Sequence, residues 1–460
     1  MNLTISQILK AVEGTAATPL RDSLGLGNIS TDSRQLGKND VFFALGGPNF
    51  DGHDFIDAAI SKGARHFVVS NPAKFPKNSK TEVNLIVVPD VLKAYGNLAA
   101  FFRGQFHVPA VAITGSSGKT TVKELAAQAL SSRFSVLKNH GTENNLVGVP
   151  KTILQLESSH EMMVLEMGTN QPGEISRLSS IISPQAAVLT LIGPSHLEKL
   201  KDIEGVRKEK MGVVANVERG GTLFVNGEDA RLVDVQSGSH RVVRVGLTKD
   251  GNDYFADNIW CHETGTSFQL NGKEVFETSL IGRHNIINSL LAIAVALTFG
   301  APMEDIRRSL KEFKPVSGRL NLKNIEDVIF IDDSYNSNPV SFRAALETLK
   351  SFKTRGKKGV VFGDMLELGS QAEAFHREAG SLLSQLMFDF VIATGPLANF
   401  AAQEALKNGV NSSSVYMASD SAEAGKICRG LVAAGDMVLV KGSRAMKMEK
   451  VFEYFKMEAV

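Results

Sequence analysis

The chain has 460 residues, a formal net charge of +1 and a hydrophobic content of 43%. This length exceeds one ordinary hydrophobic core, so we expect about three domains. The balance of 50 basic and 49 acidic residues gives no reason to expect nucleic acid or an anionic membrane as a partner. Two distant cysteines without metal-ligand spacing are typical of a reduced, cytoplasmic protein. The N-terminus does not resemble a secretory signal, and the longest apolar stretch, 286–299, is too short and too interrupted for membrane insertion.

Residues 1–85 form the first predicted domain, a small mixed α/β unit. The pattern predicts helices near the N-terminus and over 55–64, and strands over 66–70 and 85–89. Between apolar segments lies a polar run, Ser30–Arg34. Its default interpretation is a solvated turn. The alternative is a phosphate site formed by Arg34 and the neighbouring hydroxyls.

The second predicted domain, 86–314, contains AVAITGSSGKTT over 110–121. This stretch predicts a buried strand, a glycine loop and the start of a helix, an arrangement that suits a polyphosphate. Lys119 can reach the outer phosphates, and the Thr120 hydroxyl can bind Mg²⁺. One departure is that the full P-loop pattern has a glycine where this chain has Ile113. The alternative is a glycine turn that binds no ligand.

The same domain is predicted to hold a parallel sheet with further strands over 162–167, 186–192 and 222–226. One of these strands ends in Glu166, and another leads into His196. Ligands of open α/β sheets bind beyond the carboxyl ends of the strands, so Thr120, Glu166 and His196 are expected in one crevice. A buried Glu166 needs a partner, and a cation supplies one. The alternative for His196 is a loop histidine that caps a helix.

Short, polar, strand-like pieces over 241–280 predict a small antiparallel insert. A helix then opens at residues 283–285 and stops at Gly300. Polar groups at its start, His284, Asn285 and Asn288, could contact a nucleotide base. The competing interpretation is helix capping with a buried hydrogen bond.

The segment PVSGR, 315–319, is interpreted as a linker into a third domain, 315–460. Strands predicted over 328–333, 358–364, 389–395 and 436–442 alternate with helices, which indicates a second doubly wound, Rossmann-like unit. Its strands end in DD, GDMLELG and KGSR, so polar residues again gather at one edge of a sheet. The fold class predicted for the whole chain is therefore α/β.

Seven motifs occur in a fixed order: TGSSGKTT (114–121), NN (144–145), EMG (166–168), SHLEKL (195–200), GRHN (282–285), SGR (317–319) and DDSYNSNP (332–339). This set resembles the Mur ligases, the ATP-dependent amino-acid ligases of peptidoglycan synthesis, over nearly the whole chain and in the three-domain order. The resemblance is strongest to the member that adds D-alanyl-D-alanine to UDP-N-acetylmuramoyl-tripeptide. The features that favour this member are STDSRQLGKNDVFFAL, NSNP in place of DNPR, GDMLELG and VLVKGSRAMKMEKV.

The resemblance implies roles for residues of all three domains. The ATP phosphate loop would be Gly115, Ser116, Ser117, Gly118, Lys119, Thr120 and Thr121, with Asn285 and Asn288 toward the adenine and Arg319 and Asp333 reaching the nucleotide from the third domain. Two magnesium ions are implied, one on Thr120 and Glu166 and one on His196, with a carbamylated Lys210 between them. The substrate residues would be Thr31, Ser33 and Arg34 for the UDP end, Asn144 and Asn145 for the muramoyl end, and Tyr335, Asn336, Asn338 and Pro339 for D-Ala-D-Ala.

The implied reaction transfers a phosphoryl group to the tripeptide carboxylate, and the dipeptide amine then attacks the acyl phosphate. Both steps gather negative charge, which Lys119 and two Mg²⁺ ions can offset. A charged Lys210 would be repelled by magnesium, whereas its carbamate is an anion that suits a metal. The alternatives are that Lys210 is an ordinary surface lysine or that Lys208 is the modified residue. Because the three ligand sites fall on different domains, we expect the third domain to close, with residues 315–319 as the hinge.

Other functions remain open. A Mur ligase that adds a diamino acid or L-lysine is the main rival, and the third residue of the tripeptide is not legible from the sequence. Folylpolyglutamate synthase is disfavoured because its loop resembles GKGS, where this chain has GKTT. An inactive nucleotide-binding regulator is disfavoured because Lys119, Thr120, Glu166 and His196 are all present. A monomer is the default expectation.

Overall fold

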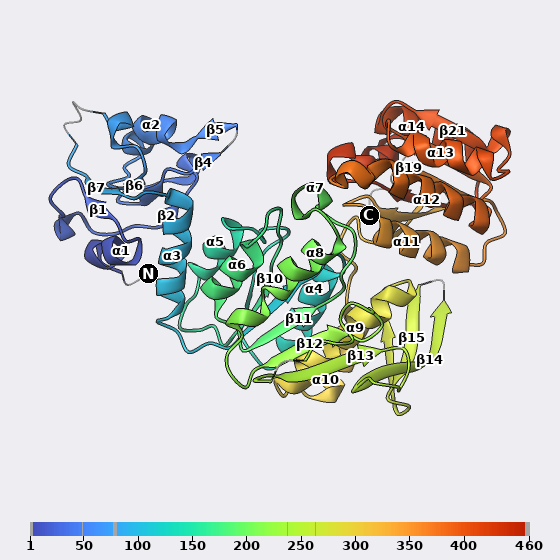
Figure 1. Cartoon of the computed structure of the whole chain (residues 1–460), viewed down its shortest axis with the longest axis horizontal. Coiled ribbons are helices and arrows are strands. Elements are labelled where there is room, and N and C mark those ends of the chain that lie inside the picture. The colour runs from blue at the N-terminus through green and yellow to red at the C-terminus, as the bar shows by residue number, and fades with distance from the viewer. Residues whose placement is uncertain (1–2, 48, 77–80, 237, 263, 456–460) are drawn as a thin grey trace.

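The computed structural model describes residues 3–47, 49–76, 81–236, 238–262 and 264–455. The chain forms an N-terminal, a central and a C-terminal unit, which follow one another along the chain (Figure 1). In the described part of the chain, no helix has both the length and the apolar character needed to span a membrane.

The N-terminal unit is built on a sheet with strand order β1-β7-β6-β3-β2, in which β1 runs antiparallel to β7 and the other pairs are parallel. Its first helix is fixed by a capping box, because the Thr4 side chain accepts from the Gln7 backbone and the Gln7 side chain accepts from Thr4. The elements are α1 (Ile5–Ala11), β1 (Thr15–Ala16), β2 (Ile29–Ser30), β3 (Val41–Phe43), the hairpin of β4 (Gly46–Gly47) and β5 (Phe50–Asp51), α2 (Ile56–Ser61), β6 (His66–Val69) and β7 (Asn84–Val87).

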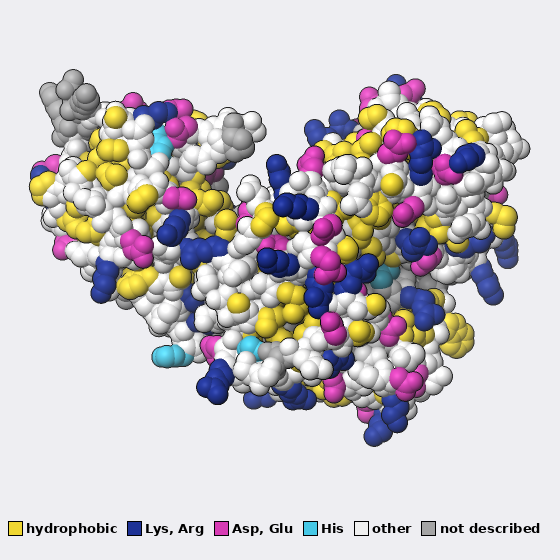
Figure 2. Space-filling model, in the orientation of Figure 1, with side chains coloured by type: hydrophobic (Ala, Val, Ile, Leu, Met, Phe, Trp, Pro, Cys, Tyr) yellow, Lys and Arg dark blue, Asp and Glu magenta, His cyan; other side chains and the backbone are white. Residues whose placement is uncertain are grey.

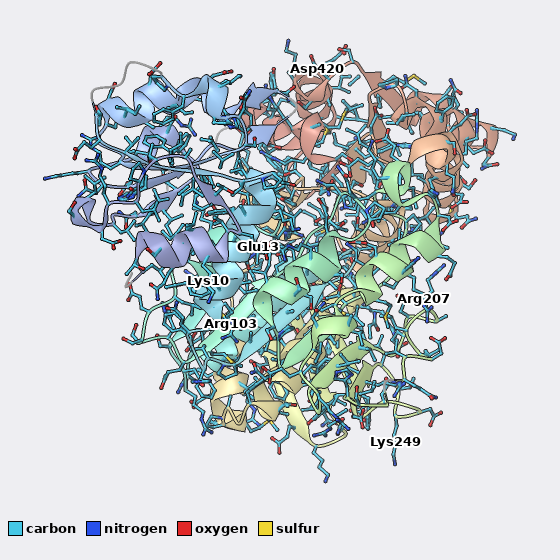
Figure 3. All side chains as sticks on the ribbon, turned by 60° about the vertical axis from the view of Figure 1, so that its left-hand side comes forward. Lys10, Glu13, Arg103, Arg207, Lys249 and Asp420 are labelled. Carbon is cyan, nitrogen blue, oxygen red and sulfur yellow. The ribbon has the colours of Figure 1, made fainter. Side chains whose placement is uncertain are left out.

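Helix α3 (Val91–Arg103) joins this unit to the central one. Arg103 at its end is buried and donates to the carbonyl oxygens of Ile182, Phe106 and Val108 at 3.0, 2.7 and 2.6 Å. Figure 3 shows Arg103 below Lys10 at the junction of the two units. The guanidinium therefore satisfies carbonyl groups of the central unit and fixes the end of α3 against it.

The central sheet has the strand order β16-β15-β14-β13-β12-β11-β8-β10-β9. The prediction of a separate antiparallel insert over 241–280 is wrong for its first strand, because β13 pairs with β12 in parallel and extends the main sheet. Among the described residues of this sheet, the antiparallel pairs are β14–β15 and β15–β16, whereas β13 pairs with β14 in parallel. The strands are β8 (Ala110–Thr114), β9 (Val136–Lys138), β10 (Met162–Glu166), β11 (Ala186–Leu189), β12 (Thr222–Asn226), β13 (Arg241–Gly246), β14 (Tyr254–His262), β15 (Gly265–Leu270) and β16 (Glu274–Thr278).

Helices cover the parallel part of this sheet. They are α4 (Lys119–Leu130), α5 (Gly148–Ile153), α6 (Glu174–Ile182), α7 (Leu197–Leu200), α8 (Ile203–Met211), α9 (Arg283–Thr298) and α10 (Met303–Glu312). Helix α9 is apolar almost all round and packs against α4, which explains why its apolar stretch lies in the core.

The C-terminal unit has a sheet with the order β17-β18-β22-β19-β20-β21, parallel except for the β17–β18 pair. Its elements are β17 (Asn321–Ile325), β18 (Val328–Asp333), α11 (Pro339–Ser351), β19 (Lys358–Gly363), α12 (Ala372–Leu386), β20 (Phe390–Thr394), α13 (Ala398–Lys407), β21 (Val415–Ala418), α14 (Ser421–Leu431) and β22 (Met437–Lys441). The predicted α/β fold class is confirmed.

Register brings the functional strand ends together. Strand β8 lies between β11 and β10, with Thr114 opposite Leu189 and Ile113 opposite Glu166. The loops that follow these strands therefore leave the sheet at the same edge, where ligands of parallel sheets bind.

Candidate active site

The loop between β8 and α4 requires glycine at two positions. Gly115 has φ +148°, and a Cβ there would lie 2.0 Å from Thr190 Oγ1. Gly118 has φ +84°, and a Cβ there would lie 2.5 Å from Asn288 Oδ1. Both the backbone conformation and the close neighbours exclude a larger residue. The loop so formed leads into the N-terminus of α4, whose free N–H groups favour an anion.

Glu166 ends β10 as a buried carboxylate that is 1% exposed. Thr120 Oγ1 donates to its Oε2 at 2.7 Å, and Asn144 Nδ2 donates to its Oε1 at 2.7 Å. A hydroxyl and a carboxylate in contact are hard oxygen donors and fit Mg²⁺. Within the described residues no three His, Cys, Asp or Glu side chains converge as a metal cluster, so the remaining ligands would be phosphate oxygens and water.

His196 immediately precedes α7 and has φ +53°. Its Nδ1 lies 2.5 Å from Oε2 of Glu367, which belongs to the C-terminal unit. His196 occupies the N-cap position of α7 with its backbone, as the alternative predicts, but in the described residues its side chain makes no capping hydrogen bond, so helix capping does not account for the imidazole. His196 lines the same cavity as Thr120 and Glu166, as predicted from the strand ends.

Helix α8 separates the two lysines that the sequence left as rivals. Lys208 is exposed, whereas Lys210 is 1% exposed. Figure 3 labels Arg207 on the same helix, where it bonds the carbonyl oxygen of Arg231. Burial holds the pKa of Lys210 well below its ordinary value, and the positive charge of Lys119 lowers this pKa further. Lys210 is therefore neither a surface lysine nor interchangeable with Lys208.

Glu209 fixes the position of α8. Its Oε2 accepts from the Gly173 N–H at 2.6 Å and its Oε1 accepts from the Ile175 N–H at 2.8 Å, both at the start of α6. A carboxylate at a helix N-terminus is favoured by the helix dipole. Because Glu209 and Lys210 are adjacent, this contact also holds the Lys210 backbone in place.

The C-terminal unit contributes charged groups to the cavity from two strand ends. Lys441 Nζ donates to Asp333 Oδ2 at 2.5 Å and to the Asn336 carbonyl at 2.9 Å. Burial raises the pKa of Asp333, although Lys441 and Arg319 oppose this shift. The Arg319 guanidinium lies over the Tyr335 ring, with Cζ 4.3 Å from the centroid. Lys119 faces this side, and burial lowers its pKa.

The loop after β18 meets the phosphate loop directly. Asn338 Nδ2 donates to the Ser116 carbonyl at 3.2 Å. The Asn338 Oδ1 also caps α11 by accepting from the Ser341 N–H at 2.9 Å, and Pro339 occupies the first helical position. The two units thus enclose a cavity of about 260 Å³ between them.

Most residues predicted for the site line this cavity. They are Ser116, Ser117, Gly118, Lys119, Thr120, Thr121, Asn144, Glu166, His196, Asn285, Asn288, Arg319, Asp333, Tyr335, Asn336 and Asn338. Asn288 lies against Gly118, at the phosphate loop, and its Nδ2 donates to Asn285 Oδ1 at 2.8 Å. Its adenine contact stays a prediction.

The predicted residues that do not line the cavity are Thr31, Ser33, Arg34, Gly115, Asn145, Lys210 and Pro339. The Asn145 side chain accepts from the N–H groups of Val147 and Gly148 and so caps the start of α5. Thr31, Ser33 and Arg34 belong to the N-terminal unit, and Figure 2 shows a broad hollow between that unit and the rest of the molecule. Arg34 is exposed and forms a paired contact with Asp32 at 2.9 Å.

Thr190 and Lys441 also line the cavity and were not assigned from the sequence, and His284, one of the polar groups noted at the start of the 283–300 helix, lines it as well. Thr190 Oγ1 donates to the Ser117 carbonyl at 2.5 Å. Burial lowers the pKa of His284 to about 4, which keeps the imidazole neutral at pH 7. Lys441 carried a sequence signal as the first residue of KGSR at the end of a strand, and His284 carried one at the start of a helix.

The fold and the cavity define a multidomain P-loop enzyme, in which a phosphate loop faces polar residues of a second α/β unit. The chain belongs to the Mur ligase family, as predicted. Three family models match it: "Mur ligase family, catalytic domain" over residues 26–103, "Mur ligase middle domain" over 113–296 and "Mur ligase, glutamate ligase domain" over 318–444.

Relatives match over nearly the full length. The UDP-N-acetylmuramoyl-tripeptide–D-alanyl-D-alanine ligase of Bacillus subtilis is 33% identical over 450 residues, 97% of each chain. A crystal structure of MurF from Acinetobacter baumannii is 31% identical with a TM-score of 0.88 and covers 98% of both chains. MurF from Thermotoga maritima, solved in complex with ADP, is 29% identical with a TM-score of 0.83, covering 95% of this chain and 98% of that one.

Proposed function

We propose that this chain is an ATP-dependent ligase that joins D-alanyl-D-alanine to UDP-N-acetylmuramoyl-tripeptide, giving the pentapeptide precursor of peptidoglycan. The observation that carries the proposal is the shared cavity, in which the phosphate loop and the Tyr335–Pro339 loop lie in contact. Full-length relatives named for this reaction supply the identity of the substrates.

The cavity residues account for the chemistry. ATP, when bound, provides the phosphoryl group that turns the tripeptide carboxylate into an acyl phosphate. Lys119 and Arg319 offset the negative charge that gathers on the transferred group. Asn336 and Asn338 hold the dipeptide on the C-terminal side, where its amine can reach the activated carbonyl. Closure of the two units over the bound substrates would exclude water, which would otherwise hydrolyse the intermediate.

Magnesium, when bound, screens the phosphate charge. Thr120 and Glu166 would hold one ion, because they are already in contact and their donors are oxygens. His196 would hold a second ion, with Lys210 as its carbamate between them. A neutral amine reacts with CO₂ and a protonated one does not, and burial lowers the Lys210 pKa. That environment supports carbamylation.

The substrate sites are proposed to be divided among the three domains. Thr31, Ser33 and Arg34 would bind the UDP end on a domain of residues 1–85, Asn144 and Asn145 the muramoyl end on residues 86–314, and Tyr335 to Pro339 the dipeptide on residues 315–460. Catalysis then requires the N-terminal unit to approach the cavity and the C-terminal unit to close about 315–319. We propose that the enzyme acts as a monomer in the cytoplasm, where ATP is available.

A phosphate-release assay tests the proposal. Release should require UDP-muramoyl-tripeptide and D-Ala-D-Ala together, and omission of either should abolish it. Release with UDP-muramoyl-dipeptide and a diamino acid or L-lysine would instead establish the rival ligase. Nucleotide binding without turnover of any acceptor would identify an inactive regulator.

The carbamate has its own test. Lys210→Ala should lose turnover and recover part of it with small carboxylates, whereas Lys208→Ala, an exposed control on the same helix, should resemble the wild type. Undiminished turnover of Lys210→Ala would end this part of the proposal.

A further inference from the structure

Two residues with left-handed backbone meet where the C-terminal unit touches the central one. His196 has φ +53° before α7, and Glu367 has φ +63° in the loop after β19. Such conformations are strained for residues other than glycine and persist where the surrounding contacts impose them. Here the contact is the 2.5 Å approach of His196 Nδ1 to Glu367 Oε2.

The backbone supports the same contact. The Glu198 N–H donates to the Glu367 carbonyl at 3.3 Å. Gly369 has φ +59°, and a Cβ there would lie 3.3 Å from the Glu198 Cα, so the two loops are closely packed. The Glu367 side chain is 55% exposed, and an exposed ion pair contributes little to stability. The pair is therefore better explained by what it does to the imidazole than by what it adds to folding.

We propose that Glu367 is a positioning residue that aims the His196 imidazole into the nucleotide cavity. Accepting the Nδ1–H fixes the tautomer in which Nε2 carries the free lone pair, and no described residue bonds Nε2. Histidines that bind metals commonly donate their other ring N–H to a carboxylate in this way. This inference rests on the proposed role of His196 as the ligand of a second magnesium ion.

The contact between His196 and Glu367 depends on docking of the two units. His196 belongs to the central unit and Glu367 to the C-terminal one, so the imidazole is oriented only while the two units are docked. The second metal ion and docking then favour each other by the same factor, as linkage requires. A metal ligand thus reports that the unit carrying the acceptor dipeptide is in place.

The test counts bound metal ions in the full chain with a non-hydrolysable ATP analogue, using Mn²⁺ and the electron paramagnetic resonance signal of the free ion. Wild type should bind two ions. Glu367→Ala should retain the first ion and lose about 10- to 100-fold in affinity for the second. Glu367→Gln, whose amide oxygen still accepts the Nδ1–H, should recover most of this loss. Glu198→Gln, an exposed acid two residues from His196, is the matched control and should titrate as wild type.

The outcomes separate the two proposals. A second ion bound by Glu367→Ala with wild-type affinity overturns the role of Glu367. Wild type that binds one ion, or His196→Ala that binds two as wild type does, counts against His196 as a ligand. Since φ at position 367 is +63°, Glu367→Gly removes the carboxylate without backbone strain and replaces the alanine variant if that one folds poorly.

Discussion

Replacing Thr120 by valine removes one hydroxyl and almost nothing else. The residue is 3% exposed, and its Oγ1 donates to Glu166 Oε2 at 2.7 Å. A buried acceptor left without its donor costs about 1–3 kcal/mol, which corresponds to a fall in melting temperature of about 2–4 °C for each kcal/mol in a domain of this size. The lost oxygen is also the proposed magnesium ligand, so we expect kcat to fall about 10²–10³-fold, comparable to the loss of a single oxyanion donor.

The assay is phosphate release at a series of Mg²⁺ concentrations with both substrates saturating. Thr120→Ser keeps the hydroxyl and loses one buried methyl group, about 0.8 kcal/mol, so it separates the oxygen from the packing. We expect Thr120→Val to need more Mg²⁺ and Thr120→Ser to follow the wild-type curve. Wild-type turnover of Thr120→Val at limiting Mg²⁺ would refute the assignment of a metal to this pair.

Three further predictions rest on single contacts. Gly118→Ala should weaken binding of an ATP analogue at least 10-fold in a calorimetric titration, because left-handed strain of about 1–2 kcal/mol adds to the contact with Asn288; Gly220→Ala, with φ +81° and open space around it, should bind normally. Lys210 has a lowered pKa in the folded chain, so below pH ~10 the unfolded chain binds a proton that the folded chain does not. In CO₂-free buffer the melting temperature of Lys210→Met should therefore exceed that of the wild type below pH ~10. This difference should shrink as the pH rises toward the pKa of the unfolded lysine. A pH-independent difference would contradict this. Asn338→Asp keeps the cap of α11 but not the donor to Ser116, so phosphate release should fall, whereas Asn338→Ala loses both and should also lose about 0.5–2 kcal/mol of cap stability in a melting experiment.

The sequence was sufficient to predict features that depend on residues close to one another in the chain. An apolar strand, two glycines and an amphipathic helix predict the loop of 114–121, and the structure has it between β8 and α4. The meeting of Thr120, Glu166 and His196 also followed, because parallel strands end at the same edge of a sheet. These predictions needed no knowledge of the packing between units.

Features that depend on packing between distant parts of the chain could not be predicted from the sequence. The strand over 241–246 has the same period whether it pairs with β12 in parallel or forms a separate hairpin, so its place in the main sheet was missed. The segment RKEK looks like a solvated helix face, and only the packing of α8 separates buried Lys210 from exposed Lys208. Asn144 and Asn145 belong to the same NN motif, but the Asn145 side chain caps α5 and does not face the cavity.

The charges of the cavity explain why its parts need one another. Burial lowers the pKa of both Lys119 and Lys210, and the charge of Lys119 lowers the pKa of Lys210 further, whereas Glu166 opposes the shift in both cases. A polyphosphate at the loop would restore the preference of Lys119 for its charged form, while carbamylation by CO₂ would convert the neutral Lys210 amine into an anion. The phosphates and the proposed carbamate would then favour bound metal ions, and the His196 imidazole, proposed to bind one of them, contacts Glu367 of the opposite unit. Binding of the nucleotide and of the metal ions would thereby be coupled through charge, because a buried charge is unfavourable without an opposite charge nearby.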